Sequence, residues 1–194
     1  MLELPTAESL VAKLMARGIT LSAGVVRVGA YGDSPALSDA LIALIRLGRK
    51  RAGTGLLWAY EAEGEATPVV GEIEIVVDHH NAPALVTRTT SVQVIPYGEV
   101  TAEYAAIEGE GDGSLAYWRE AHWAFFSREC QRLSRKPDDS MLVVCSVFEV
   151  LHALPVEYYS TARVAEFDAS EKEVANFFAA DTNGYRSGFP PSRE

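Results

Sequence analysis

Apolar residues recur every three or four positions in several stretches of the chain, and this spacing is typical of helices that bury one face. The clearest helix start is Gly32-Asp33-Ser34-Pro35, where Ser34 or Asp33 can cap the first turn and proline has its φ angle already set. Together, the spacing and the start signals predict helices over residues 6–17, 36–46, 100–107, 115–133 and 170–180.

Between these helices, runs rich in valine, isoleucine, leucine and threonine predict strands. They cover residues 56–60, 69–77, 84–95 and 141–151, with a further short strand inside residues 19–30. Residues 69–77 alternate polar and apolar side chains through their middle, which indicates a half-buried strand. Residues 141–151 are more continuously apolar and indicate a buried strand.

The composition is that of an ordinary globular protein, with 194 residues of which 48% are hydrophobic and 23% charged. This length fits one domain with additions. The formal net charge of -10 argues against a protein that coats duplex nucleic acid, because such a protein needs a broad basic face. No apolar run is long enough to span a bilayer and the N-terminus has no secretory signal, so we expect a cytoplasmic protein with no membrane partner.

The densest basic cluster lies in the segment Arg46–Gly55, which contains four basic residues and three glycines. Glycines let a backbone turn sharply and approach a ligand closely, and a basic turn of this kind suits an anion such as phosphate. A helix C-terminus whose basic side chains complement its dipole explains the same residues without a ligand. Both interpretations stay open at this point.

Three other groups of residues lack the spacing that metal sites require. His79 and His80 are adjacent on a predicted turn with no third ligand near them in sequence, and we interpret them as exposed. The acids of residues 108–112 lack the remaining positions of a calcium-binding loop, and Cys130 and Cys145 have no metal-ligand spacing. We therefore predict no metal and no cofactor.

Several stretches together resemble the ASCH domain family of the PUA-like superfamily, over roughly residues 25–151. The matching stretches are Tyr31-Gly32-Asp33-Ser34-Pro35, Gly48-Arg49-Lys50, Leu56-Leu57-Trp58, Glu108-Gly109-Glu110-Gly111-Asp112 with Ser114-Leu115, Trp118-Arg119, His122 and Phe125-Phe126. The resemblance implies an α+β fold, in the form of a PUA-like, mostly antiparallel β-barrel with helices packed around it. It also implies three segments: an N-terminal helical extension over 1–24, the ASCH domain over 25–154 and a partly helical C-terminal extension over 155–194.

The family is linked to RNA and nucleotide binding, and two of its branches resemble enzymes. One branch hydrolyses the amide of N4-acetylcytidine, and the other cleaves single-stranded RNA. Lys50 matches the lysine of the glycine-x-lysine element that the family shares. In the amidohydrolase branch a threonine stands three residues after this lysine, where this chain has Gly53, and Thr54 follows one position later. Either Glu108 or Glu110 matches the glutamate of that branch.

The resemblance and the residue chemistry together place the site around Lys50. We predict Lys50, Thr54 and Glu108 as catalytic residues, with a lysine of lowered pKa as the base and the carboxylate as a proton shuttle. If nearby carboxylates raise the pKa of the lysine instead, the same residues hold a ligand without reaction. The predicted nucleotide- or RNA-binding residues are Arg49, Arg51, Gly53, Trp58, Arg119, His122 and Ser127. For His122, which lies among aromatic residues of its helix, packing is the simpler interpretation.

Three functional hypotheses follow from these residues. The first is a module that binds single-stranded RNA or a modified nucleoside. The second is a hydrolase, either a ribonuclease or an amidohydrolase acting on N4-acetylcytidine. The third is a protein-interaction domain. A concave pocket that Lys50 and Glu108 both face favours the first two, whereas separate, exposed positions favour the third.

Overall fold

The computed structural model describes residues 4–21, 24–32 and 34–154, so the predicted helix over 170–180 and the proposed C-terminal extension lie outside the described residues. In chain order the elements are α1 (Ala7–Met15), β1 (Val26–Ala30), α2 (Pro35–Arg46), β2 (Ala52–Leu56), α3 (Leu57–Glu63), β3 (Ile73–Val77), β4 (Pro83–Pro96), the 3-10 helix η1 (Tyr97–Glu99), α4 (Ala102–Glu108), α5 (Leu115–Arg132) and β5 (Leu142–Ala153).

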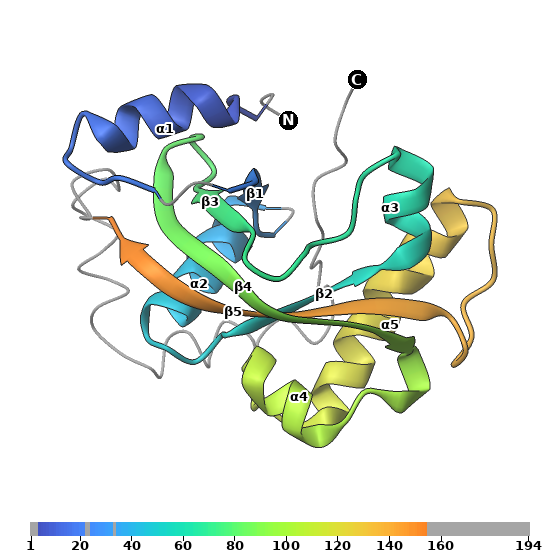
Figure 1. Cartoon of the computed structure of the whole chain (residues 1–194). Helices are drawn as coiled ribbons and strands as arrows, with labels where there is room; N and C mark the ends of the chain where they lie inside the picture. Colours follow the sequence, from blue (N-terminus) through green and yellow to red (C-terminus); the bar gives the residue numbers. More distant parts are fainter. Residues whose placement is uncertain (1–3, 22–23, 33, 155–194) are drawn as a thin grey trace.

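The five strands form one mixed, curled sheet in the order β1–β3–β4–β5–β2 (Figure 1). β1 and β3 pair in parallel, and the other neighbouring strands pair antiparallel. The long β4–β5 ribbon carries register shifts between Val86 and Thr87 and between Thr89 and Ser91. Because such bulges bend and twist a strand, the sheet curls into a half-barrel. The predicted α+β fold is confirmed in this form.

Helices pack against the curled sheet and divide its core into several clusters (Figure 1). Leu10 and Leu14 of α1 are buried against β3, so the N-terminal helix shares the core of the sheet. Ile42 and Ile45 of α2 pack with residues of β3, β4 and β5. Phe126 of α5 belongs to another cluster, with residues of α4 and β5. This arrangement places the end of α2 and the end of α4 at the same edge of the sheet, where the site described below is built.

Capping side chains set the helix starts that the sequence indicated. The side-chain oxygens of Thr6, Ser34 and Ser114 accept hydrogen bonds from the backbone N–H three residues further on. Pro35 occupies the first helical position of α2, as predicted. Among the described helices, none has the length and apolar character needed to cross a membrane.

The strand predicted over residues 56–60 is wrong, because β2 ends at Leu56 and α3 begins at Leu57. The strand is instead the preceding segment, which pairs with β5. Leu, Ala and Glu in α3 favour a helix, and Gly64 ends it in the left-handed conformation. Gly55 allows the abrupt change of direction, since a Cβ there would lie 2.7 Å from a ring carbon of Tyr60.

The other predicted strands are confirmed with shifted ends. β3 begins only at Ile73, because the residues before it form a turn in which Val69 and Val70 are exposed. His80 is exposed, as expected, whereas His79 is half-buried. The Nδ1 atom of His79 lies 3.1 Å from Oδ1 of Asp39 on α2, which accounts for the difference.

Candidate functional site

Lys50 follows α2 after a tight turn. Gly48 takes a φ angle of +79°, and the backbone N–H groups of Arg49 and Lys50 both donate to the carbonyl oxygen of Leu44, at 3.0 and 3.1 Å. The turn carries the Lys50 side chain into the protein, where only 2% of it is exposed. A buried ammonium group requires anionic or polar partners. They come from residues 108–112, the last residue of α4 and the loop that follows it, which we call the acidic loop.

The acidic loop docks on the Lys50 turn through backbone contacts. The N–H of Arg51 donates to the carbonyl oxygen of Ile107 at 2.9 Å. Gly109, with a φ angle of +67°, approaches so closely that a Cβ there would lie 2.1 Å from the carbonyl oxygen of Arg49. Glycine is therefore required at this position both for its conformation and for its lack of a side chain.

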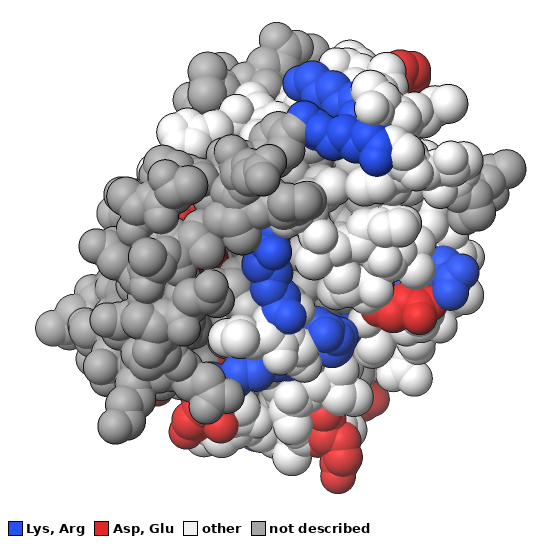
Figure 2. Space-filling view, turned by 90° about the vertical axis from the view of Figure 1, so that its left-hand side faces the viewer, with Lys and Arg blue, Asp and Glu red and all other residues white. Residues whose placement is uncertain are grey.

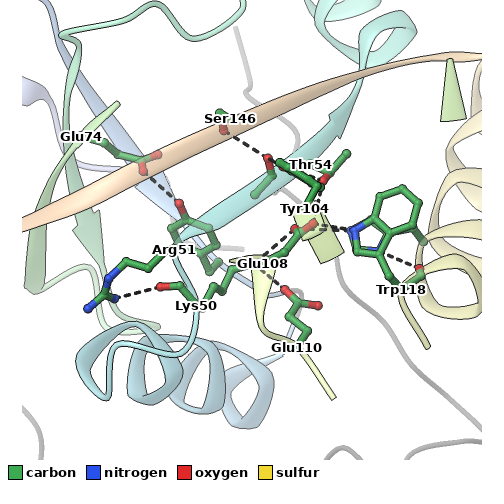
Figure 3. Close-up of polar contacts among 12 residues, drawn as sticks. Lys50, Arg51, Thr54, Glu74, Tyr104, Glu108, Glu110, Trp118 and Ser146 are labelled. Carbon is green, nitrogen blue, oxygen red and sulfur yellow. Dashed lines mark hydrogen bonds and ion pairs between the residues drawn. The ribbon is translucent and has the colours of Figure 1, made fainter. Parts of the chain in front are cut away.

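Two carboxylates of the docked loop reach Lys50 (Figure 3). The Nζ atom of Lys50 lies 2.6 Å from Oε1 of Glu110 and 3.4 Å from Oε1 of Glu108. The sequence left these two glutamates as alternatives, and the structure brings both of them to the lysine. The three side chains are all buried, so their charges interact with little screening by water.

The Glu108 carboxylate is the centre of the polar network. Its Oε2 atom accepts hydrogen bonds from the Thr54 hydroxyl at 2.7 Å and from the Trp118 indole N–H at 2.6 Å. Its Oε1 atom faces Lys50 and lies 3.5 Å from Nε2 of His122. Four side chains from α5, β2 and the Lys50 turn therefore compensate one carboxylate that is only 1% exposed.

The charges of this network hold Lys50 protonated and Glu108 ionised at neutral pH. Burial lowers the pKa of Lys50, but the carboxylates of Glu110 and Glu108 outweigh burial and bring its pKa above the ordinary value. Burial raises the pKa of Glu108, but the charges of Lys50 and His122 outweigh it and hold the pKa well below its ordinary range. Of the two directions considered for the lysine pKa, the two carboxylate contacts favour the raised one.

The register of β2 on β5 determines which residue meets Glu108. The Thr54 side chain points to the face of β2 that meets Glu108, whereas a side chain at the neighbouring position 53 would point to the other face, because side chains alternate along a strand. The Tyr104 hydroxyl donates to the carbonyl oxygen of Gly53 at 2.8 Å and lies 3.1 Å from the Thr54 hydroxyl. A threonine four residues after the lysine thus meets the glutamate, even though the resemblance implied a spacing of three.

His122 is packed into the same network rather than exposed to solvent. It is 4% exposed, and its ring stacks on that of Trp118 with the ring centroids 4.2 Å apart. Its Nδ1 lies 3.0 Å from the carbonyl oxygen of Trp118, and its Nε2 faces Glu108. Because both ring nitrogens face oxygen acceptors, the doubly protonated ring satisfies both contacts.

We expect the pKa of His122 to lie above 6.5 and to fall when Glu108 is replaced by glutamine. Burial lowers the pKa of His122, but the Glu108 carboxylate outweighs it and raises the pKa. Histidine ring signals followed by nuclear magnetic resonance across a pH titration measure this value in the wild type and in Glu108→Gln. Identical titrations of His122 in the wild type and in Glu108→Gln would contradict the predicted contact.

We also expect Trp118→Phe to lower the free energy of unfolding by about 2 kcal/mol, because it removes a hydrogen bond donated to a buried carboxylate. The matched control is Trp123→Phe, since Trp123 lies on the same helix with 38% of its surface exposed. Chemical denaturation measures both changes, and the control is expected within about 0.5 kcal/mol of the wild type. Equal losses in the two variants would show that the indole N–H contributes nothing.

The two arginines that flank Lys50 have backbone partners. The Arg51 guanidinium donates to the carbonyl oxygens of Ile45 at 2.6 Å and Lys50 at 3.0 Å, so it caps the end of α2. Figure 3 shows this group turned away from the Glu108 carboxylate. The Arg49 guanidinium lies 3.5 Å from the carbonyl oxygen of Gly111.

Three other predicted site residues lie elsewhere. Trp58 is on α3, where the Arg135 guanidinium lies 4.4 Å from its ring centroid. Arg119 is exposed on α5 and donates to the carbonyl oxygen of Gly98 at 3.2 Å. Ser127 is half-buried further along α5. These three are not among the described residues that line the pocket around Lys50.

Two adjoining pockets open beside the network. The first, which we call the Lys50 pocket, is lined by Lys50, Thr54, Glu108, Glu110 and His122, together with Ala30, Tyr31, Gly32, Leu41, Gly53 and Phe125. The second, which we call the large pocket, has a volume of about 150 Å³ and is lined by residues of all five strands and of α3 and α5. The two pockets share Ala30, Tyr31, Gly53 and Phe125, and we call them together the cleft.

Sequence reasoning did not identify Tyr31 and Glu74 as site residues. Tyr31 lies in the wall that the two pockets share, with its ring centroid 5.9 Å from Nζ of Lys50. Its hydroxyl donates to Oε2 of Glu74 in the large pocket, at 3.0 Å. The available signals were an aromatic residue directly before the strong helix start and a polar position inside a half-buried strand.

The curled five-stranded sheet with helices packed around it matches the α+β fold of solved ASCH domain structures. The ASCH domain family model matches residues 27–152, and the chain belongs to this family. An ASCH domain from Lactobacillus crispatus JV V101 is 33% identical, with a TM-score of 0.62, over 74% of this chain and 89% of that one. A protein from Enterococcus faecalis V583 is 31% identical, with a TM-score of 0.61, over 72% of this chain and 83% of that one. No curated protein matches the chain.

Proposed function

We propose that the protein binds a nucleobase, either of a modified nucleoside or of single-stranded RNA, in the cleft beside Lys50. The observation that carries this proposal is that Lys50, Thr54 and Glu108 line one pocket, which continues into a larger one. Membership of the ASCH family supports a ligand related to nucleic acids. A protein-interaction module draws less support, because the lysine and the glutamate are buried together rather than exposed separately.

The cleft offers the two kinds of contact by which proteins hold unpaired bases. Tyr31 and Phe125 stand in the shared wall and present aromatic surface for stacking. Lys50 supplies a hydrogen-bond donor, and Glu110 supplies an acceptor suited to an amino group of a base. A base whose polar edge points to Lys50 can therefore keep its apolar face against the aromatic wall.

Hydrolysis of the amide in N4-acetylcytidine is a second candidate function, and the Thr54–Glu108 hydrogen bond of 2.7 Å favours it. In this scheme the Thr54 oxygen attacks the acetyl carbon, and the hydroxyl proton passes to Glu108 and then to the departing amino nitrogen. Charged Lys50 donates to the acetyl oxygen as it becomes negative. Water then hydrolyses the acetyl-threonine ester, releasing acetate and restoring the hydroxyl.

Cleavage of single-stranded RNA draws less support from the geometry. His122, the titratable residue of α5 considered for acid–base work, is 4% exposed and has both ring nitrogens against oxygen acceptors. Arg119 lies elsewhere on α5, bonded to Gly98. These positions favour a structural role for both residues over direct contact with a phosphodiester.

One experiment tests binding and both reactions together. The purified chain is incubated with N4-acetylcytidine and, separately, with a short single-stranded RNA that contains it, and the products are followed by mass spectrometry. Equilibrium binding of both ligands is measured in parallel. Thr54→Val removes the proposed nucleophile, Thr54→Ser retains a hydroxyl, and Thr90→Val is the control at an exposed position of β4.

Binding and hydrolysis predict different results. Loss of the acetyl group alone, abolished in Thr54→Val and retained in Thr54→Ser and Thr90→Val, supports the amidohydrolase. Shortened RNA supports the ribonuclease instead. If the ligands bind saturably but are not changed, the protein binds them without catalysing a reaction. If the wild type shows neither binding nor products, the proposal is overturned for these ligands.

A further inference from the structure

The cleft is strongly acidic. Among the described residues, the large pocket is lined by five glutamates, namely Glu63, Glu65, Glu72, Glu74 and Glu129, and two more line the Lys50 pocket. The cations of the same lining are Arg27 in the large pocket, Lys50 and, when it is protonated, His122. A concave surface with this excess of carboxylates concentrates a negative potential, because its low-dielectric walls focus the field.

The cations of the cleft already have carboxylate partners, and His122 faces Glu108. Lys50 lies between Glu108 and Glu110. Arg27 contacts Glu72 at 3.3 Å and Glu65 at 3.8 Å, and it also donates to a backbone carbonyl oxygen at 2.8 Å. A phosphate that entered the cleft would therefore compete with carboxylates for each cation, and it would leave those carboxylates without compensation.

Arg49 and Arg51, the arginines next to Lys50, do not offset the excess of carboxylates in the cleft. Arg51 caps α2, and the described lining of the two pockets contains neither Arg49 nor Arg51. Figure 2 shows the described Lys and Arg side chains of one face in groups with other residues between them, and one of these groups lies directly against an acidic side chain. A strand of RNA, with one negative charge per nucleotide, finds no continuous basic path on the part of this face that is described.

Glu74 is the acid best placed to contact a ligand in the large pocket. It lies on β3 and accepts the Tyr31 hydroxyl, in the wall that joins the two pockets. Its carboxylate passes over Gly29, where a Cβ would lie 2.1 Å from Oε1. The oxygens of an ionised carboxylate can accept several hydrogen bonds, so Glu74 can also accept from the amino or hydroxyl groups of a ligand, such as those of a base or a ribose.

We propose that the cleft selects a nucleoside without a phosphate, and that Glu74 contributes to this selection by accepting ligand donors and repelling phosphate. This inference rests on the proposed function, since it takes the ligand to be a nucleoside. It narrows the ligand from nucleic acid in general to a free nucleoside. A phosphomonoester carries a charge of about -1.5 to -2 near pH 7, and like charges brought together in a desolvated site weaken binding strongly.

The test compares matched ligands on the full chain by isothermal titration calorimetry. The probes are the four ribonucleosides, N4-acetylcytidine and the 5′-monophosphate of each, at low and at high salt. We expect the best nucleoside to bind at least about tenfold more tightly than its monophosphate at low salt, and the ratio to shrink at high salt through screening. Glu74→Gln is expected to reduce the ratio, whereas Glu120→Gln, at an exposed position outside the cleft, leaves it unchanged.

The outcomes separate this inference from the function on which it rests. A monophosphate that binds as tightly as its nucleoside, or more tightly, overturns the inference and leaves nucleobase binding intact. An unchanged ratio in Glu74→Gln overturns the role of that residue. If none of the ten ligands binds, the proposed function fails for this class and the inference fails with it.

Discussion

Lys50→Met is expected to lower the free energy of unfolding by about 3–5 kcal/mol at neutral pH. The substitution keeps most of the side-chain volume and removes the charge, so it leaves Glu108 and Glu110 buried without their cation. Breaking one side of a buried ion pair costs far more than the pair itself contributes, because the remaining charge stays desolvated. Chemical denaturation at several pH values measures the change.

The loss in Lys50→Met is expected to depend on pH. The pKa of Glu108 is held below its ordinary value of 4.5, so its contribution to stability is present above pH 4.5 and is lost as the pH falls toward the folded-state pKa. The variant lacks the charge that lowers this pKa, so the difference from the wild type narrows below pH 4.5. Lys13→Met, at an exposed position of α1, is the control and is expected within about 0.5 kcal/mol of the wild type. A Lys50→Met variant as stable as this control would show that the buried pair is absent.

The second large effect is expected for Gly109→Ala, with a loss of about 2–5 kcal/mol in the free energy of unfolding. Part of this loss is the left-handed conformation, about 1–2 kcal/mol for a residue with a Cβ. The rest comes from a clash, because the new Cβ would lie 2.1 Å from the carbonyl oxygen of Arg49. This clash forces the acidic loop away from the Lys50 turn, at a cost of about 1–3 kcal/mol.

Gly113→Ala separates these two contributions. Gly113 has a φ angle of +75°, close to the +67° of Gly109, but no heavy atom lies within 4 Å of the position that a Cβ would take there. We therefore expect it to show only the conformational cost. Calorimetric unfolding of the two variants gives the difference directly, and equal losses would contradict the close docking of the acidic loop on the lysine turn.

The local signals of the sequence were sufficient to predict α1, α2, α4 and α5 and the turn that precedes Lys50. Ser34 and Pro35 define the start of α2, and Gly48 defines the turn that follows it. The prediction failed directly after β2, where Leu56-Leu57-Trp58-Ala59-Tyr60 has the composition of a strand. The tertiary structure overrides this preference: the chain turns into α3 directly after β2, and the Tyr60 ring packs over Gly55, where a Cβ would lie 2.7 Å from a ring carbon.

The residues that contact Lys50 and Glu108 could be predicted from the sequence only where the resemblance to the ASCH family named them. The family spacing of three residues after Lys50 falls on Gly53, whereas the predicted threonine, Thr54, is the residue that meets Glu108 through its position on β2. Tyr31 follows β1 and Glu74 lies on β3, so the two meet only in the folded chain. The sequence likewise could not show that Arg51 turns back to α2, since that contact depends on the path of the backbone.

The most direct test of ligand binding in the cleft beside Lys50 is a titration of the ¹⁵N-labelled chain with N4-acetylcytidine, followed by nuclear magnetic resonance. Binding in the cleft predicts saturable shifts that are largest at the amides of Tyr31, Lys50 and Thr54, which line the Lys50 pocket. The amides of Arg119 and Trp123, on the outer side of α5, serve as the reference surface. Shifts concentrated at that outer surface, or no saturable shifts at any amide, would contradict a ligand site at Lys50.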